Sequence, residues 1–175
     1  MKKRIPGNGS STGSDLPALV LRLAIGPMLI AHGYNKVFGK GGLKGTTGWF
    51  DALGLHPAHV HARLAAATEI GAGTLIAVGA ASPLPAAAAI GLMTTAARTD
   101  HKGKGFFVFK GGWEYTAVVA AVATAMAALG PGKFSVDALR GKQRSGALWG
   151  ILAALFGIAN STALLAASYR PEPKP

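Results

Sequence analysis

The stretch that decides the fold is LPALVLRLAIGPMLIAHGY, residues 16–34. Arg22 is the one ionised side chain in this apolar run, and a run of roughly 20 residues is what a helix needs to cross a hydrocarbon layer of ~30 Å. The side chains are mostly small or aliphatic, which lets helix backbones approach closely, as they often do in lipid. The run therefore predicts a first transmembrane helix.

Four further apolar runs predict that this helix belongs to a bundle. They cover about residues 62–81, 83–97, 113–129 and 147–168. Pro83 suits the first turn of a helix, so the second and third runs predict a helical hairpin. Gly130 and Pro131 end the fourth run, and Ser135 is the expected N-cap of a short helix that ends at Leu139. We expect an all-α fold, a bundle of about five transmembrane helices.

The composition of the chain also indicates a membrane protein. Half of the 175 residues are apolar and 14% are charged, against roughly 25% charged residues in soluble domains. Cysteine is absent, which excludes disulfides and thiol redox chemistry within the chain, so any redox role needs a cofactor or a partner. The net charge of +11 comes from segments between the apolar runs, which favours contact with anionic lipid over nucleic acid.

Polar segments divide the chain into four parts. We predict a disordered basic tail at 1–15, a four-helix membrane core at 16–140, a linker with an additional transmembrane helix at 141–169, and a Pro-rich tail at 170–175. Glycines between Gly39 and Gly48 predict an interruption of helix, followed by a short amphipathic turn with Trp49 and Phe50 at the membrane interface. The patch Phe106–Phe109 is too short to span, and it predicts an interfacial or re-entrant segment.

Ionisable side chains within or beside the apolar runs are the candidate functional residues. An ionised group in hydrocarbon costs roughly 2.5–3.5 kcal/mol on insertion scales, so it usually faces the bundle and pairs. Glu69 stands beside Gly71 and Gly73, which allow close helix contact, and its expected partners are Lys36, Arg98 or His101. Alternating spans bring six such side chains to one side of the bundle, which we name face B: His32, Lys36, Glu69, Arg98, His101 and Glu114.

Two interpretations of face B stay open at this point. In the functional one, these residues form a pocket, capped by the Trp49–Phe50 and Phe106–Phe109 segments, that binds a head group or relays protons through its glutamates and histidines. In the structural one, buried ion pairs fix the order of the helices. Arg22 lies nearer the opposite side, where we expect a structural role with its guanidinium at headgroups or at backbone carbonyls of a helix end.

Two further patterns do not predict a site. His56, His59 and His61 resemble a metal tract, but the intervening Pro57 and the lack of nearby acids or cysteines leave the ligand set incomplete, so we expect a solvated loop and no metal. The Gly-rich residues 39–47 have no strand before them and lack the Gly-Lys-Ser/Thr ending of a phosphate loop, so nucleotide binding is not expected.

Several motifs, in this order, resemble the DoxX family of small membrane proteins. They are RLAIG at 22–26, HGYNKVFG at 32–39, EIGAG at 69–73, EY at 114–115 and GPGKFSVD at 130–137. The resemblance covers roughly residues 16–140 and implies a four-helix core, so the run at 147–168 would be an addition. It also implies a multi-pass protein of the bacterial plasma membrane, linked to thiosulfate:quinone oxidoreductase subunits and oxidative-stress assemblies. The family's recurrent polar positions correspond to Arg22, His32, Lys36, Glu69, His101 and Glu114.

The sequence therefore predicts a DoxX-like membrane subunit that supports redox or stress-response chemistry, with a quinone or lipid head group bound at face B. Lys36 and Arg98 would keep the carboxylates ionised. A catalytic role would be that of a quinone-linked oxidoreductase subunit rather than a self-sufficient enzyme. The alternative is a non-catalytic scaffold that docks a partner through the additional helix. Expected partners are membrane lipid and either another protein or a second copy of the chain, with no nucleic acid.

Overall fold

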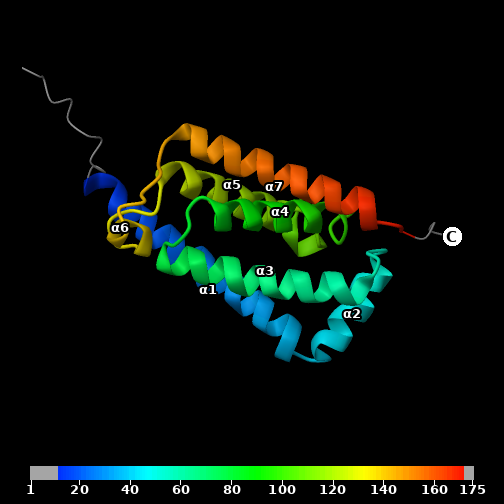
Figure 1. The fold of residues 1–175 in the computed structure, drawn as a ribbon. Helices are drawn as coiled ribbons and strands as arrows, with labels where there is room; N and C mark the ends of the chain where they lie inside the picture. The colour runs from blue at the N-terminus through cyan, green and yellow to red at the C-terminus, as the bar shows by residue number, and fades with distance from the viewer. Residues whose placement is uncertain (1–11, 172–175) are drawn as a thin grey trace, which may run out of the picture.

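Seven α-helices and one 3-10 turn make up the computed structural model, which describes residues 12–171 (Figure 1). They are α1 (Thr12–Phe38), α2 (Gly42–Ala52), α3 (Ala58–Val78), α4 (Leu84–Arg98), η1 (Val108–Lys110), α5 (Glu114–Leu129), α6 (Val136–Leu139) and α7 (Ala147–Ser168). Over these residues there is no β-strand, only an isolated bridge between Leu55 and Tyr169. The predicted all-α class is therefore confirmed.

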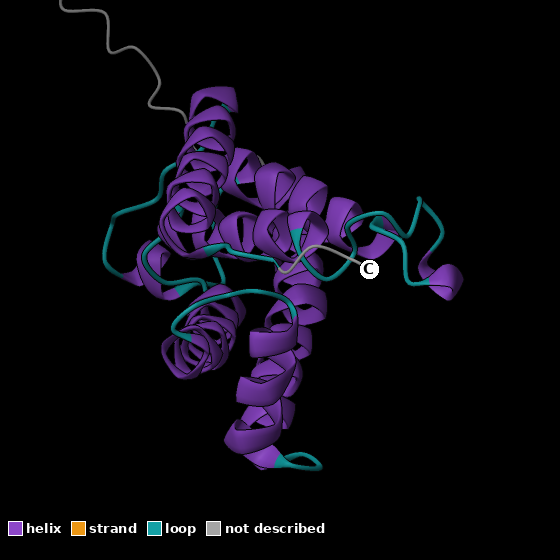
Figure 2. Ribbon diagram, turned by 90° about the vertical axis from the view of Figure 1, so that its right-hand side faces the viewer, coloured by secondary structure: helices purple, strands orange, loops and turns teal. Residues whose placement is uncertain are grey.

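The long helices form two groups that meet where α4 contacts α3. In the first group α1 packs along α3, and α2 lies across one end of both; in the second, α4, α5 and α7 pack against one another (Figures 1 and 2). The main apolar core lies where the groups meet, and its largest fully buried side chains are Leu29 of α1 and Ile90 of α4. This arrangement leaves α3 and α7 on opposite sides of α4.

Glycines hold α1 and α3 close together. A Cβ atom at Gly33 would lie 2.9 Å from the carbonyl oxygen of Ala66, and one at Gly73 would lie 2.7 Å from that of Gly26. Neither position has room for a side chain, so the two backbones are in direct contact. Of the two glycines expected to allow this approach, only Gly73 does so, because a Cβ at Gly71 would have no atom within 4 Å.

Two helices are long and apolar enough to cross a membrane by length and composition, Ser14–Phe38 of α1 and all of α7. The helices α4 and α5 have 15 and 16 residues. At ~1.5 Å per residue each reaches only about 22–24 Å, less than the ~30 Å of a hydrocarbon core. The bundle of five spans thus stays a prediction, whereas the helices themselves lie where the apolar runs place them.

The first helix begins earlier than its apolar run predicts. Thr12 lies inside the predicted disordered tail of residues 1–15, yet α1 starts there. Asp15 accepts a hydrogen bond from the backbone N–H of Lys133 at 2.8 Å, which ties this first turn to the segment after α5. The rest of that predicted tail, residues 1–11, and residues 172–175 of the predicted C-terminal tail lie outside the described residues.

The helix α2 forms where glycines predict an interruption and only a short turn. The interruption is real but brief, because α1 ends at Phe38 and α2 starts at Gly42 and continues through Gly45 and Gly48. A glycine inside a helix costs about 1 kcal/mol relative to alanine. Packing offsets this cost: Phe50 is buried, and the hydroxyl of buried Thr46 donates to the carbonyl oxygen of Lys36 at 2.9 Å.

The end of α7 is joined to the α2–α3 connection by two backbone hydrogen bonds, which we name the backbone clip. The N–H of His56 donates to the carbonyl oxygen of Ser168 at 2.9 Å, and the N–H of Arg170 donates to that of Gly54 at 2.7 Å. The clip connects the last helix to the first group of helices, although α7 packs along its length against α4 and α5.

Candidate functional site

Arg22 is buried at the end of the bundle where α3 finishes. Its guanidinium donates to the carbonyl oxygens of Ile76 and Ala77 in the last turn of α3, both at 3.1 Å. It also donates to those of Pro131 and Phe134, which connect α5 to α6. The last carbonyls of a helix have no partner within the helix, so Arg22 caps α3 and fastens the α5–α6 connection to it.

Lys36 of α1 and Glu69 of α3 form a close ion pair near the other end of these helices. The Lys36 Nζ to Glu69 Oε1 distance is 2.6 Å, and the two side chains are 13% and 5% exposed. Gly33, one turn before Lys36, makes this approach possible, since a Cβ there would lie 2.9 Å from the Cβ of Glu69. The spacing of the residues along the sequence predicts Lys36 as one of three possible partners of Glu69, and in the structure Lys36 is the partner.

The second carboxylate oxygen of Glu69 has no such partner. Oε2 is buried and accepts no hydrogen bond from any residue in the described part of the chain. A buried acceptor left unsatisfied typically costs about 1–3 kcal/mol, and more when it is charged. Buried polar atoms in proteins are nearly always paired, so this oxygen calls for an explanation in function or in bound solvent.

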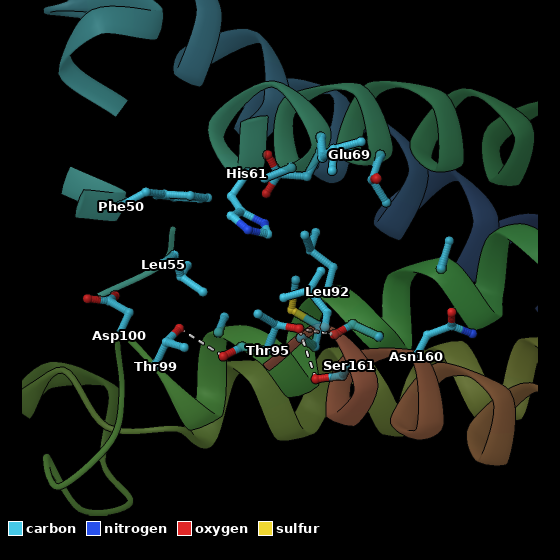
Figure 3. Close-up of a pocket in the computed structure, with 18 of the residues that line it drawn as sticks. Phe50, Leu55, His61, Glu69, Leu92, Thr95, Thr99, Asp100, Asn160 and Ser161 are labelled. Atoms are coloured by element: carbon cyan, nitrogen blue, oxygen red, sulfur yellow. Dashed lines mark hydrogen bonds between the residues drawn. The ribbon is translucent and has the colours of Figure 1, made fainter. Parts of the chain in front are cut away.

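Glu69 and Lys36 line a cavity of about 560 Å³ between α3 on one side and α4 with α7 on the other. Figure 3 shows Glu69 and His61 on the α3 side of this cavity, with Thr95 and Ser161 across it. The hydroxyls of Thr95 and Ser161 are 2.9 Å apart and share a hydrogen bond. The rest of the lining is mainly aliphatic and aromatic, and both this character and the volume are typical of small-molecule sites.

The remaining face B residues lie outside this cavity. His32 of α1 is exposed, and its Nε2 is 3.4 Å from the hydroxyl of Tyr115 on α5. Arg98, at the end of α4, donates from Nη1 to the hydroxyl of Thr162 on α7 at 2.9 Å. Neither side chain lines the cavity with Glu69.

His101 and Glu114 both stabilise the loop between α4 and α5. His101 Nδ1 is 2.6 Å from the carbonyl oxygen of Gly111, and Glu114 Oε2 accepts from the backbone N–H of Val108 at 2.9 Å. The aromatic patch Phe106–Phe109 in this loop is exposed and does not line the cavity. Of the two segments predicted to cap the pocket, Trp49–Phe50 therefore lines it and the aromatic patch does not.

Several polar cavity residues have no place in the site predicted from sequence, among them His61, Asn160 and Ser161. His61 is buried on α3, with Nε2 3.3 Å from the carbonyl oxygen of His56, so its assignment to a solvated loop is wrong. No group of three or more possible metal ligands occurs among residues 12–171. Asn160 and Ser161 belong to α7, and their signal in the sequence is a polar triplet, Asn-Ser-Thr at 160–162, in the middle of an apolar run.

The fold and the site define an all-helical protein in which a buried ion pair lines a cavity of small-molecule size. Residues 18–102 match the sequence profile of the DoxX family, as the motifs in this part of the chain predict. The matched range holds α1 from residue 18 onward, all of α2, α3 and α4, and both members of the ion pair, while α5, α6 and α7 lie outside it. No curated protein and no solved structure matches the chain.

Proposed function

We propose that the protein crosses the bacterial plasma membrane several times and binds the hydroxyl-bearing head group of a neutral amphiphile in the cavity beside Glu69. The spans would be α1, α3, α4, α5 and α7. DoxX proteins are membrane-associated, and α1 and α7 have the length and composition of spans. Many large apolar side chains on the outside of the bundle are exposed, as lipid contact requires; examples are Leu16, Val20, Leu23, Val118, Ile151 and Leu155.

The observation that carries the proposal is that Glu69, whose buried Oε2 has no partner in the described part of the chain, lines this cavity. A ligand hydroxyl would donate the missing hydrogen bond, and bonds to a charged acceptor are the strong ones. Neither an anionic nor a cationic head group meets an uncompensated charge of opposite sign in the lining, because Lys36 and Glu69 neutralise each other and the carboxylate of Asp100 is paired with Lys104. A neutral donor, such as a quinol or a lipid alcohol, is the chemistry that fits.

A bound quinol would give the protein a place in the redox or oxidative-stress chemistry that the DoxX resemblance implies. The chain contains no cysteine, so electrons would pass between the quinol and a cofactor on a partner protein. We therefore propose a quinone-linked oxidoreductase subunit that holds the quinol, and not a self-sufficient enzyme. The roles of the chain's own residues are to bind the hydroxyl at Glu69 and to keep Glu69 ionised through Lys36.

Binding to purified protein in nanodiscs tests this proposal. The probes are a decyl-substituted benzoquinol, its dimethyl ether, which has no donor, and dioctanoylglycerol, a neutral lipid alcohol. The quinol is expected to bind at least tenfold more tightly than the ether, because only the quinol satisfies Oε2. Glu69→Gln should remove that preference. Glu114→Gln is the matched control, since its carboxylate lies outside the cavity.

The outcomes separate the possible ligands. Preference for dioctanoylglycerol over the quinol would assign the cavity to a lipid alcohol. Equal affinity for the quinol and its ether in wild-type protein would refute hydrogen bonding to Glu69, and with it the proposed function.

A non-catalytic scaffold is the second candidate, and α7 is the feature that favours it. This helix lies outside the family match, and one of its sides is apolar and exposed. If α7 docks a partner and the cavity binds nothing, none of the three probes will bind. Substitutions such as Ile151→Ser on the exposed side of α7 would then reduce retention of the partner in native membranes.

A further inference from the structure

We infer that the ligand reaches the cavity sideways from the lipid, through a gap between α3 and α7, and that Asn160 contacts its polar group at this entrance. The inference rests on the proposed function and deepens it by assigning a route and a specificity-determining residue. It also gives α7, which the family match does not include, a part in the binding site.

The end of the cavity nearest the α2–α3 connection is closed. The backbone clip joins that connection to the end of α7. Beneath the clip, Phe50, Leu55 and Leu165 are buried in one apolar cluster that also includes the start of α3. The clip and this cluster therefore close the cavity between the α2–α3 connection and the end of α7; beside them, Trp49 of α2 lines the cavity and is 44% exposed.

The side of the cavity between α3 and α7 is open. Leu64 of α3 and Phe156 of α7 both line the cavity, yet they are 52% and 60% exposed, and Leu84 at the start of α4, which also lines it, is 62% exposed. A residue that lines a cavity and is also exposed marks where the cavity reaches the surface. Because α4 separates α3 from α7 (Figure 1), no tight helix packing closes the gap between them. The rim of this opening is apolar, which suits access from lipid rather than from water.

Asn160 is the polar side chain at this opening. It lines the cavity, is exposed, and lies near the middle of a helix that is otherwise mostly apolar (Figure 3). Among residues 12–171 its side chain makes one hydrogen bond, from Nδ2 to the carbonyl oxygen of Phe156 at 3.0 Å. The oxygen and the second N–H of its side-chain amide are left for another partner. An amide without hydrogen-bond partners in an apolar medium carries a free-energy cost. A ligand with a second polar group would provide that partner.

The absence of cysteine from the chain makes the route testable by labelling. Phe156→Cys places a thiol at the opening. Val118→Cys on α5 is the control, because it is similarly exposed, at 58%, and does not line the cavity. In proteoliposomes, a lipophilic N-alkylmaleimide is expected to label both thiols, and a charged maleimide neither. The decyl benzoquinol should slow the labelling of Phe156→Cys at least fivefold and leave that of Val118→Cys unchanged.

Two results would overturn the route. One is fast labelling of Phe156→Cys by the charged maleimide, which would mean that the opening faces water. The other is quinol binding that depends on Glu69 but gives no protection at position 156, which would leave the proposed function standing and remove the lateral route alone. Loss of quinol binding in wild-type protein would instead overturn both.

The role of Asn160 is tested with the quinol and its monomethyl ether, which keeps one hydroxyl for Glu69. Wild-type protein is expected to prefer the quinol by about three- to tenfold, the value of one further hydrogen bond. Asn160→Leu should abolish this preference and still bind the monomethyl ether better than the dimethyl ether. Thr162→Val, a change at a neighbouring α7 position that does not line the cavity, is the control. An unchanged preference in Asn160→Leu would overturn the assignment.

Discussion

Arg22 and Glu69 are both charged and almost fully buried, at 5% and 4% exposure, but their surroundings differ in kind. Within residues 12–171, Arg22 donates four hydrogen bonds, all to backbone carbonyls, two in α3 and two in the α5–α6 connection. Glu69 has one side-chain partner, Lys36, and one oxygen without any in the described part of the chain. Burial alone therefore does not separate a charge with a full set of partners from one with an unsatisfied acceptor, whereas the inventory of partners does.

The largest expected effect is that of Arg22→Met, which tests the structural role of Arg22 and should lower the free energy of unfolding by about 3–5 kcal/mol. The reason is that four carbonyl oxygens lose the donor that Arg22 provides, and the hydrogen bonds to Ile76 and Pro131 are fully buried. The control is Arg98→Met, which removes an exposed guanidinium with one side-chain partner, and should cost less than about 1 kcal/mol. Unfolding in mixed micelles of detergent and SDS measures both. Similar losses in the two variants would contradict the structural role of Arg22.

Gly33→Ala is expected to have the next largest effect, a loss of about 1–3 kcal/mol from overpacking. The new Cβ would meet the carbonyl oxygen of Ala66 and the Cβ of Glu69 at 2.9 Å, so α3 must shift and quinol affinity should fall with stability. Gly71→Ala is the matched control in open space; it should stabilise by about 0.5–1 kcal/mol, because glycine is a poor helix residue. Equal stabilities for the two alanine variants would rule out the close contact of α1 and α3.

Ser135→Ala should cost about 1 kcal/mol, the usual value of an N-cap. Its Oγ accepts from the backbone N–H of Ala138 at 3.1 Å, at the start of α6, near the carbonyls that Arg22 holds. Because this end of the molecule is structural, thermal stability should fall while quinol affinity stays within twofold of wild type. Ser135→Thr keeps the hydroxyl and should behave as wild type. A marked loss of quinol affinity in Ser135→Ala would show that the two ends are coupled.

The smallest effect on stability is expected when both members of the ion pair are replaced, in Lys36→Met/Glu69→Met. Apolar replacement of a buried pair is often neutral or slightly stabilising, so the free energy of unfolding should change by about 1 kcal/mol or less. Glu69→Met alone leaves the Lys36 ammonium nearly buried and unpaired, and should cost about 2 kcal/mol. Discrimination between the quinol and its dimethyl ether should be lost in both variants. A matching double replacement is not possible for Arg22, because its partners are backbone carbonyl oxygens that no substitution removes.

The sequence predicts most of the helices well, since long apolar runs with glycine and proline at their ends are a strong signal. The run at 147–168 coincides with α7, and the run at 113–129 differs from α5 by one residue. The helix α2 is not predicted, because local glycine content is outweighed by the burial of Thr46 and Phe50, which only the tertiary structure provides.

The candidate site is predicted in part. The cost of a buried charge correctly singles out Glu69 and restricts its partners to a few cations, but helix spacing cannot choose among Lys36, Arg98 and His101. That choice depends on the close contact of α1 and α3, which brings Lys36 to Glu69. A pocket is predicted, but its position between α3, α4 and α7 and the place of Asn160 in its lining are not, because a gap between helices arises from their relative positions and leaves no pattern along the chain.

The backbone clip has a consequence for how freely this region can diverge in related sequences. Main-chain atoms alone form its two hydrogen bonds. Other side chains at His56, Ser168 and Arg170 are therefore compatible with the backbone clip. Proline is the exception at His56 and Arg170, whose N–H groups are the donors. Gly54 is constrained as well, since its φ of 83° disfavours other residues and a Cβ there would lie 2.6 Å from the Cα of Pro171.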